Sequence, residues 1–212
     1  MKKIVLGILI MVSFYSNAQE YKLEEKLVTG IFEANGKTKA ELFSAINKWI
    51  SVNYNSANSV IQLNDLESGT IIVKGINTIV NKSFIKSFLH PDLQKKTSFN
   101  TMTYNFSHLI EINIKDNKFR IMYLITKYED YGNDNEIFKR INFEGIDNNT
   151  VENYNALADG LLETFMIDKK NKQAMRDAMK PMLDEMNSSL ENDIKNTLQS
   201  IYKTATEKTE GW

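Results

Sequence analysis

Hydrophobic residues recur at helical spacing between residues 38 and 53, with most of the polar residues on the opposite side. The apolar face consists of Leu42, Ile46, Trp49 and Ile50. Thr38, followed three residues later by Glu41, is typical of a capping box that satisfies free N–H groups at a helix start. The pattern therefore predicts a capped helix over 38–53 whose apolar face, including Trp49, is buried.

Strand-like patterns lie on both sides of this helix. Residues 27–33 alternate between apolar and polar types, after a polar stretch at 19–26 that we expect to be a flexible lead-in. Segments 59–63 and 70–74 predict a hairpin, with the second strand stopped by Gly75. Residues 76–98 are expected to form a connection with about one helical turn.

The strongest strand signal is a second hairpin, formed by residues 104–114 and 119–128 around a turn at Asp116 and Asn117. A two-residue turn predicts three cross-strand pairs, which are Ile114 with Phe119, Ile112 with Ile121, and Ile110 with Tyr123. All six side chains then share one face, and a one-residue slip would move the whole set to the other side.

Beyond this hairpin, residues 131–149 are polar, with one edge strand expected at 137–143. The periodicity then becomes helical. One stripe contains Tyr154, Leu157, Leu161 and Phe165, and a longer one contains Met175, Met179, Met182, Met186, Leu190, Ile194, Leu198 and Ile201. Pro181 lies inside the second stripe, where its missing N–H and its clash with the Asp177 carbonyl predict a kink or a break.

The first 18 residues are typical of a signal peptide, with Lys2 and Lys3 ahead of an apolar run and a small-residue cleavage site ending at Ala18. We expect cleavage before Gln19 and a periplasmic or secreted protein. The expected organisation is a signal peptide at 1–18, an α+β domain at 19–149, C-terminal helices packing on it at 150–206, and a frayed tail at 207–212.

Composition excludes several classes of protein. The 212 residues are 42% hydrophobic and carry a formal net charge of −1. Cleavage would remove two lysines and no acid, leaving 24 basic against 27 acidic residues, or −3, which does not attract nucleic acid. The apolar run near the N-terminus is too short to span a bilayer, and no later segment comes close. The sequence contains no cysteine, so disulfide bonds and thiolate chemistry are excluded.

Three groups of residues resemble a family of exported bacterial proteins known as a domain of unknown function with a TATA-box-binding-protein-like (TBP-like) fold. They are Lys37 through Phe43 leading to Trp49; Asp65 through Gly69, Thr70 and Ile71 to Lys74 and Gly75; and Ile112 through Arg120. The resemblance covers about residues 28–128 and implies a curled antiparallel sheet gripping one helix, in the order β-α-β4-α, here with a C-terminal helical extension. It implies no catalytic residue, and a fold name alone does not imply DNA binding.

Candidate chemistry is sparse. His90 and His108 are the only histidines and stand far apart, so we expect ordinary histidines rather than a metal site. The methionine stripe, with Met166 upstream, could bind Cu(I) or a partner, but methionines at helical spacing usually fill a core. Glu111 and Arg120 are expected to form a surface ion pair. We therefore expect no catalytic residue, cofactor or metal.

Two functional hypotheses remain. The first is a non-catalytic envelope module that binds a ligand or a protein, and the second is a hydrolase or lyase whose carboxylates form no recognisable motif. For the first we predict a binding surface on the sheet's other face, made of Leu109, Arg120, Met122 and Leu124. We expect the C-terminal helices to cover its apolar end, leaving a groove beside Arg120; otherwise those helices would be a surface for self-association.

Overall fold

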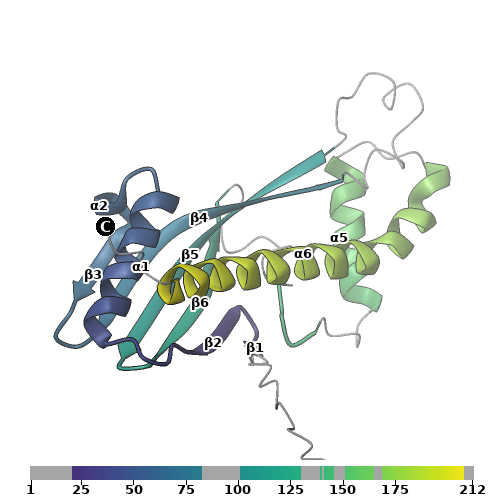
Figure 1. The fold of residues 1–212 in the computed structure, drawn as a ribbon. Coiled ribbons are helices and arrows are strands. Elements are labelled where there is room, and N and C mark those ends of the chain that lie inside the picture. The colour runs from purple at the N-terminus through teal and green to yellow at the C-terminus, as the bar shows by residue number, and fades with distance from the viewer. Residues whose placement is uncertain are drawn as a thin grey trace, which may run out of the picture.

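The computed structural model describes residues 21–82, 101–129, 139, 141–145, 151–164 and 169–207. Within these residues, six antiparallel strands form one sheet in the order β1-β2-β6-β5-β4-β3 (Figure 1). The strands are β1 (Tyr21–Glu24), β2 (Leu27–Glu33), β3 (Ile61–Asp65), β4 (Thr70–Lys82), β5 (Thr101–Lys115) and β6 (Lys118–Tyr128). The helices are α1 (Lys39–Asn53), α2 (Ala57–Val60), α5 (Val151–Thr164) and α6 (Lys172–Thr206), with a 3-10 turn, η2, at Lys169–Asn171. The fold is α+β, as predicted.

The predicted hairpin register is confirmed. Ile114 pairs with Phe119, Ile112 with Ile121 and Ile110 with Tyr123, and all six side chains are buried on one face of the sheet, called here the inner face. The turn requires Asn117 to adopt a positive φ of 64°, which asparagine tolerates better than most residues.

The hairpin turn also holds the start of α1. Asp116 Oδ1 accepts a hydrogen bond of 2.7 Å from the Lys39 backbone N–H, in the first turn of the helix. The predicted capping box is present, because the Glu41 N–H donates to Thr38 Oγ1 and the Thr38 N–H donates to the Glu41 carboxylate. The start of α1 is therefore satisfied both locally and by a turn some 77 residues further along the chain.

Several local predictions were wrong. Residues 21–24 of the expected flexible lead-in form β1, which pairs with β2. Helix α2 takes up the first two residues of the strand expected at 59–63, so β3 starts at Ile61 and ends at Asp65. Strand β4 continues through Gly75 to Lys82, because β5 pairs with it along its whole length. Residues 141–143 are not a strand, although Ile141 and Phe143 are buried.

Helices α1 and α6 both pack on the inner face (Figure 1). Trp49 is buried as predicted, and its indole Nε1–H donates to Ser200 Oγ of α6 at 2.9 Å. Tyr202 of α6 stacks on Phe32 with ring centroids 5.4 Å apart. The sheet thus holds two helices where one was expected.

This placement corrects the predicted role of the C-terminal helices. We expected Leu161, Phe165, Met179 or Met186 to cover Leu109, Met122 or Leu124 on the other, outer face. Helix α6 instead packs on the inner face, where a Cβ added to Gly30 would lie 3.2 Å from Leu198, and Met179 and Met186 are also buried. Phe165 lies outside the described residues, as does the side chain of Leu161.

The methionine stripe is part of the hydrophobic core, since Met175, Met179, Met182 and Met186 are all buried. Met166 and His90 lie outside the described residues.

Helix α6 runs through Pro181 without a break, and the proline itself is exposed. The described helices include none that is both long and apolar enough to cross a membrane.

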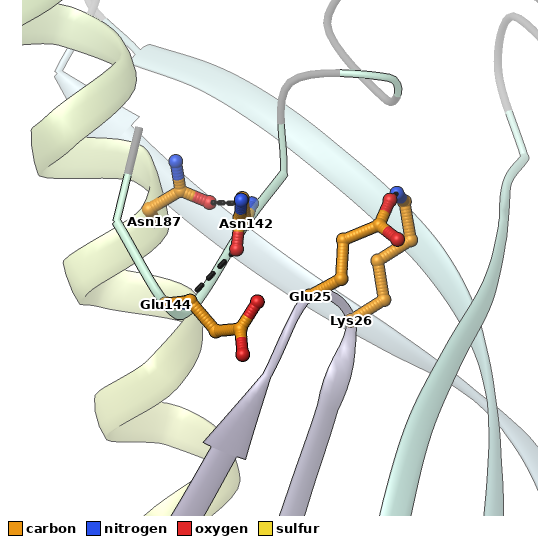
Figure 2. A network of polar contacts seen from close by, with 5 residues as sticks. All are labelled: Glu25, Lys26, Asn142, Glu144 and Asn187. Carbon is orange, nitrogen blue, oxygen red and sulfur yellow. Dashed lines mark hydrogen bonds and ion pairs between the residues drawn. The ribbon is translucent and has the colours of Figure 1, made fainter. Parts of the chain in front are cut away.

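Figure 2 shows how residues 141–145 are tied to the rest of the domain. Asn187, a buried polar residue of α6, accepts a hydrogen bond from the Asn142 N–H at 3.3 Å, and the Asn142 side chain accepts one from the Glu144 N–H at 2.9 Å. The Phe143 N–H donates to the Glu25 carbonyl in the β1–β2 turn at 2.9 Å. These bonds join the N-terminal strands to α6 and explain why a segment without regular structure can bury Ile141 and Phe143.

Candidate functional site

The outer face of the sheet brings the four predicted binding residues together. Leu109 and Leu124 are direct cross-strand partners on β5 and β6, and Met122 and Arg120 follow at alternate positions of β6. Leu124 is 37% exposed, Leu109 and Met122 are half-buried, and Arg120 is exposed. The β2 residue opposite Arg120 is Ile31, which is 59% exposed.

A groove lies at the Arg120 end of this surface. It has a volume of about 290 Å³ and is lined by Ile31, Asn113, Lys115, Lys118, Phe119 and Arg120. We call it the Arg120 groove. Of its lining residues, only Arg120 belongs to the predicted set. Ile31 was missed because pairing of β2 with β6 cannot be read from the hairpin pattern, whereas Lys115 and Lys118 flank the predicted turn and could have been included.

Arg120 is held by an amide rather than by the expected carboxylate. Asn113 Oδ1 accepts from Arg120 Nη2 at 2.6 Å and from Nε at 3.2 Å, and Asn113 Nδ2 donates to Glu111 Oε1 at 3.1 Å. The expected direct Glu111–Arg120 ion pair is replaced by this relay, because Asn113 is the direct cross-strand partner of Arg120. The guanidinium is thus oriented without being neutralised.

The groove is locally cationic. In the part of the chain that the structure describes, Lys115, Lys118 and Arg120 form no ion pair within 4.0 Å. Glu33, the cross-strand partner of Lys118, is exposed on the same face but makes no such contact. Three positive side chains therefore surround a partly apolar floor in a chain whose net charge is −1.

The described carboxylates do not favour acid–base catalysis. The shifted pKa values among them, those of Glu41, Asp65 and Glu129, are all lowered, chiefly by hydrogen bonds from Thr38, Ser68 and Lys127 respectively. A carboxylic acid that donates a proton near neutral pH needs its pKa raised instead. Among the described residues, no group of three His, Asp or Glu side chains lies close enough to hold a metal ion.

His108 lies on the inner face and is buried, with 5% of its surface exposed. Its Nε2 shares a 3.0 Å hydrogen bond with Tyr54 Oη, and its Nδ1 has no partner. Burial lowers the pKa of His108 from 6.5 to about 4 and raises the pKa of Tyr54 to about 12. Both groups are therefore neutral across the physiological range.

This burial predicts that lowering the pH destabilises the fold. Below pH 6.5 the unfolded chain binds a proton at His108 that the folded chain binds only near pH 4, so stability falls as the pH falls through that window. Between pH 6.5 and pH 5, the free energy of unfolding should drop by about 1–2 kcal/mol from this group. Denaturant titrations of the native chain and of His108→Gln should show this slope only in the native chain, and parallel curves would contradict the assignment.

Comparison with known proteins confirms the family resemblance. Residues 29–128 match the model of a domain of unknown function (DUF4468) with TBP-like fold. Among solved structures, a DUF4468 family protein from Bacteroides ovatus is 13% identical, with a TM-score of 0.47 over 88% of this chain and 90% of its own. A TBP-like protein from Parabacteroides distasonis is 16% identical, with a TM-score of 0.44 over 87% of this chain and 95% of its own. No curated protein matches the chain.

Proposed function

We propose that this protein is an exported, non-catalytic binding module of the cell envelope, and that the outer face around the Arg120 groove is its contact surface. The observation that carries the proposal is the set of three cations that form no ion pair with the described residues, beside exposed Ile31. Export rests on the signal-like segment at residues 1–18.

The positive charge of the groove favours a negatively charged ligand. A positive patch in a chain of negative net charge is complementary to carboxylates, and Arg120 can bind a carboxylate with two parallel N–H groups. Because Asn113 already orders the Arg120 side chain, less conformational entropy is lost when a ligand binds.

The shape of the surface favours a segment of a partner protein over a small carboxylate. The outward residues Arg120, Met122 and Leu124 extend along β6 for about 14 Å, and Leu109 lies beside Leu124 on the neighbouring strand. Because alternate side chains of an extended segment share a face, a segment with acidic residues at one end and apolar residues further along can place carboxylates at the cations and apolar groups along this strip. We therefore assign an acidic, partly apolar segment of an envelope protein as the occupant.

Binding of a synthetic peptide with Glu residues in one half and Leu residues in the other tests this assignment. Isothermal titration should show binding that weakens as the salt concentration rises, since the attraction is partly between exposed charges. Arg120→Glu should weaken binding at least about tenfold, which corresponds to about 1.4 kcal/mol. Lys172→Glu, an exposed residue of α6 with the same change of charge, is the matched control and should bind as the native chain does.

Three results would count against the proposal. They are no binding of the Glu-Leu peptide, equal binding of a Lys-Leu peptide, and equal losses in the two charge-reversal variants. Sedimentation of the native chain over a range of concentrations adds one further outcome. A dimer abolished by Ile31→Glu would show that the outer face is a surface for self-association rather than for an acidic partner.

A further inference from the structure

A second hollow lies on the inner face, separated from the Arg120 groove by the sheet. It has a volume of about 190 Å³ and is bounded by the end of α1, strands β4 to β6, and α6. Trp49, His108 and Tyr123 form its floor and are at most 5% exposed, whereas Asn53, Ile76 and Thr197 form a more accessible rim. Tyr54 and Asn77 complete the lining. We call this hollow the Tyr54 pocket.

Gly75 allows the pocket to form. A Cβ added at this position would lie 2.7 Å from His108 Nε2 and 2.8 Å from Tyr54 Cε1, closer than side chains can pack. The absence of a side chain therefore lets the Tyr54–His108 pair sit directly against β4. Glycine inside a long strand usually marks such a close approach, and here it explains why Gly75 does not end β4.

The hydrogen-bond arrangement leaves Tyr54 able to donate. His108 Nδ1 is buried without a partner, and a buried N–H is rarely left unpaired. In the arrangement that avoids this, His108 Nε2 carries the ring proton and donates it to Tyr54 Oη at 3.0 Å. The Tyr54 hydroxyl hydrogen is then available to a molecule in the pocket.

Other polar groups around the pocket are uncharged or already engaged. Asn53 Nδ2 donates to the Trp49 carbonyl at 2.9 Å, which leaves its Oδ1 as an acceptor on the rim. Asp193, the nearby carboxylate of α6, accepts from Asn77 Nδ2 at 2.8 Å. With the pKa of His108 near 4 and that of Tyr54 near 12, the imidazole and the phenol carry no charge at neutral pH.

We propose that the Tyr54 pocket is a binding site for a small uncharged amide, whose carbonyl accepts from the Tyr54 hydroxyl. The aromatic floor would contact the apolar part of the ligand, and Asn53 Oδ1 is the acceptor available to its N–H. The volume is several times the share of about 30 Å³ that one water occupies, yet it is below the range of about 300–1,000 Å³ typical of drug-sized ligands. The site therefore suits a single amide-bearing group.

N-methylacetamide is the probe for this proposal. Added to the full chain, it should shift the NMR signal of the Trp49 indole N–H with saturation at a Kd of about 1–10 mM, a range reasonable for so small a ligand. The only other tryptophan, Trp212, supplies a reference signal. Acetate and methylammonium, which are similar in size but charged, should produce no saturable shift.

Two tyrosine variants separate binding from folding. Tyr54→Phe removes the hydroxyl and keeps the ring, and it should weaken the saturable shift at least tenfold. Tyr202→Phe makes the same change in α6 at a ring that stacks on Phe32 outside the pocket, and it should bind as the native chain does. Thermal unfolding of both variants checks that each is folded at the temperature of the titration.

Each remaining outcome would overturn the proposal. Absence of a saturable shift would mean that the pocket holds only water, and equal binding of acetate or methylammonium would exclude selection for an uncharged ligand. Unchanged affinity in folded Tyr54→Phe would exclude the hydroxyl as the donor. None of these results bears on the Arg120 groove, because Arg120 lies on the opposite face of the sheet.

Discussion

Replacing Trp49 with alanine is expected to lower the free energy of unfolding by about 3–5 kcal/mol, the range typical of a large aromatic side chain removed from a core. Trp49 is 5% exposed and lies between α1 and α6, with its ring edge-on to Tyr54 at a centroid distance of 6.0 Å. The substitution removes this packing and also the hydrogen bond from Nε1 to Ser200. Denaturant unfolding followed by circular dichroism measures the change.

Ser200→Ala is the matched control for the Trp49 substitution. It removes only the hydrogen bond at the edge of the indole, so the expected loss is about 0.5–1.5 kcal/mol. A Trp49→Ala chain with an unchanged unfolding midpoint would contradict the central role of α1. Equal losses in the two variants would instead assign the effect to the hydrogen bond rather than to the packing of the ring.

A chain shortened to end at Asn149 is expected to lose its stable fold. The C-terminal half of α6 alone contributes four aliphatic side chains with no exposed surface, which are Leu190, Ile194, Leu198 and Ile201. At about 1.5–3 kcal/mol for each buried aliphatic side chain, their loss amounts to about 6–12 kcal/mol, comparable with the whole stability of a typical domain. The inner face would also be opened around Phe32, which now stacks on Tyr202.

The shortened chain should bind a hydrophobic dye, aggregate in sedimentation experiments and show no cooperative thermal transition. A chain ending at Glu207, which keeps all of α6, should behave as the full chain does and is the control for shortening as such. A monomeric chain ending at Asn149 that unfolds cooperatively and binds no dye would show that the sheet and α1 fold without α6. Helix α6 would then be an accessory rather than part of the core.

Local patterns determined those elements whose signals lie close together in the sequence. The helix from Lys39 to Asn53 follows from its capping box and apolar face, because both depend on residues three or four positions apart. The β5–β6 register follows from alternation on both sides of a short turn, since only one register buries all six apolar side chains. The motifs within residues 28–128 also sufficed to recognise the TBP-like family resemblance.

Tertiary structure decided which face each amphipathic element covers. A stripe such as Met175 to Ile201 shows that α6 must be buried, but burial is equally favourable against any apolar surface. A Cβ at Gly30 would lie 2.7 Å from the Phe32 ring and 3.2 Å from Leu198, so the missing side chain leaves room for both on the inner face, and the Trp49–Ser200 hydrogen bond joins α6 to α1. The outer face was left open as a result, so the predicted surface at Leu109, Arg120, Met122 and Leu124 is more exposed than expected.

The sequence also did not predict which residues surround individual polar side chains. His108 and Gly75 are 33 positions apart and have no local pattern in common, yet β4–β5 pairing places them opposite each other. Likewise, Ile31 reaches Arg120 only through the pairing of β2 with β6. The sequence by itself determined α1, the β5–β6 hairpin and the apolar stripe of α6. Non-local strand pairing and helix packing decided which polar groups meet, because these contacts depend on backbone geometry that no short stretch of chain encodes.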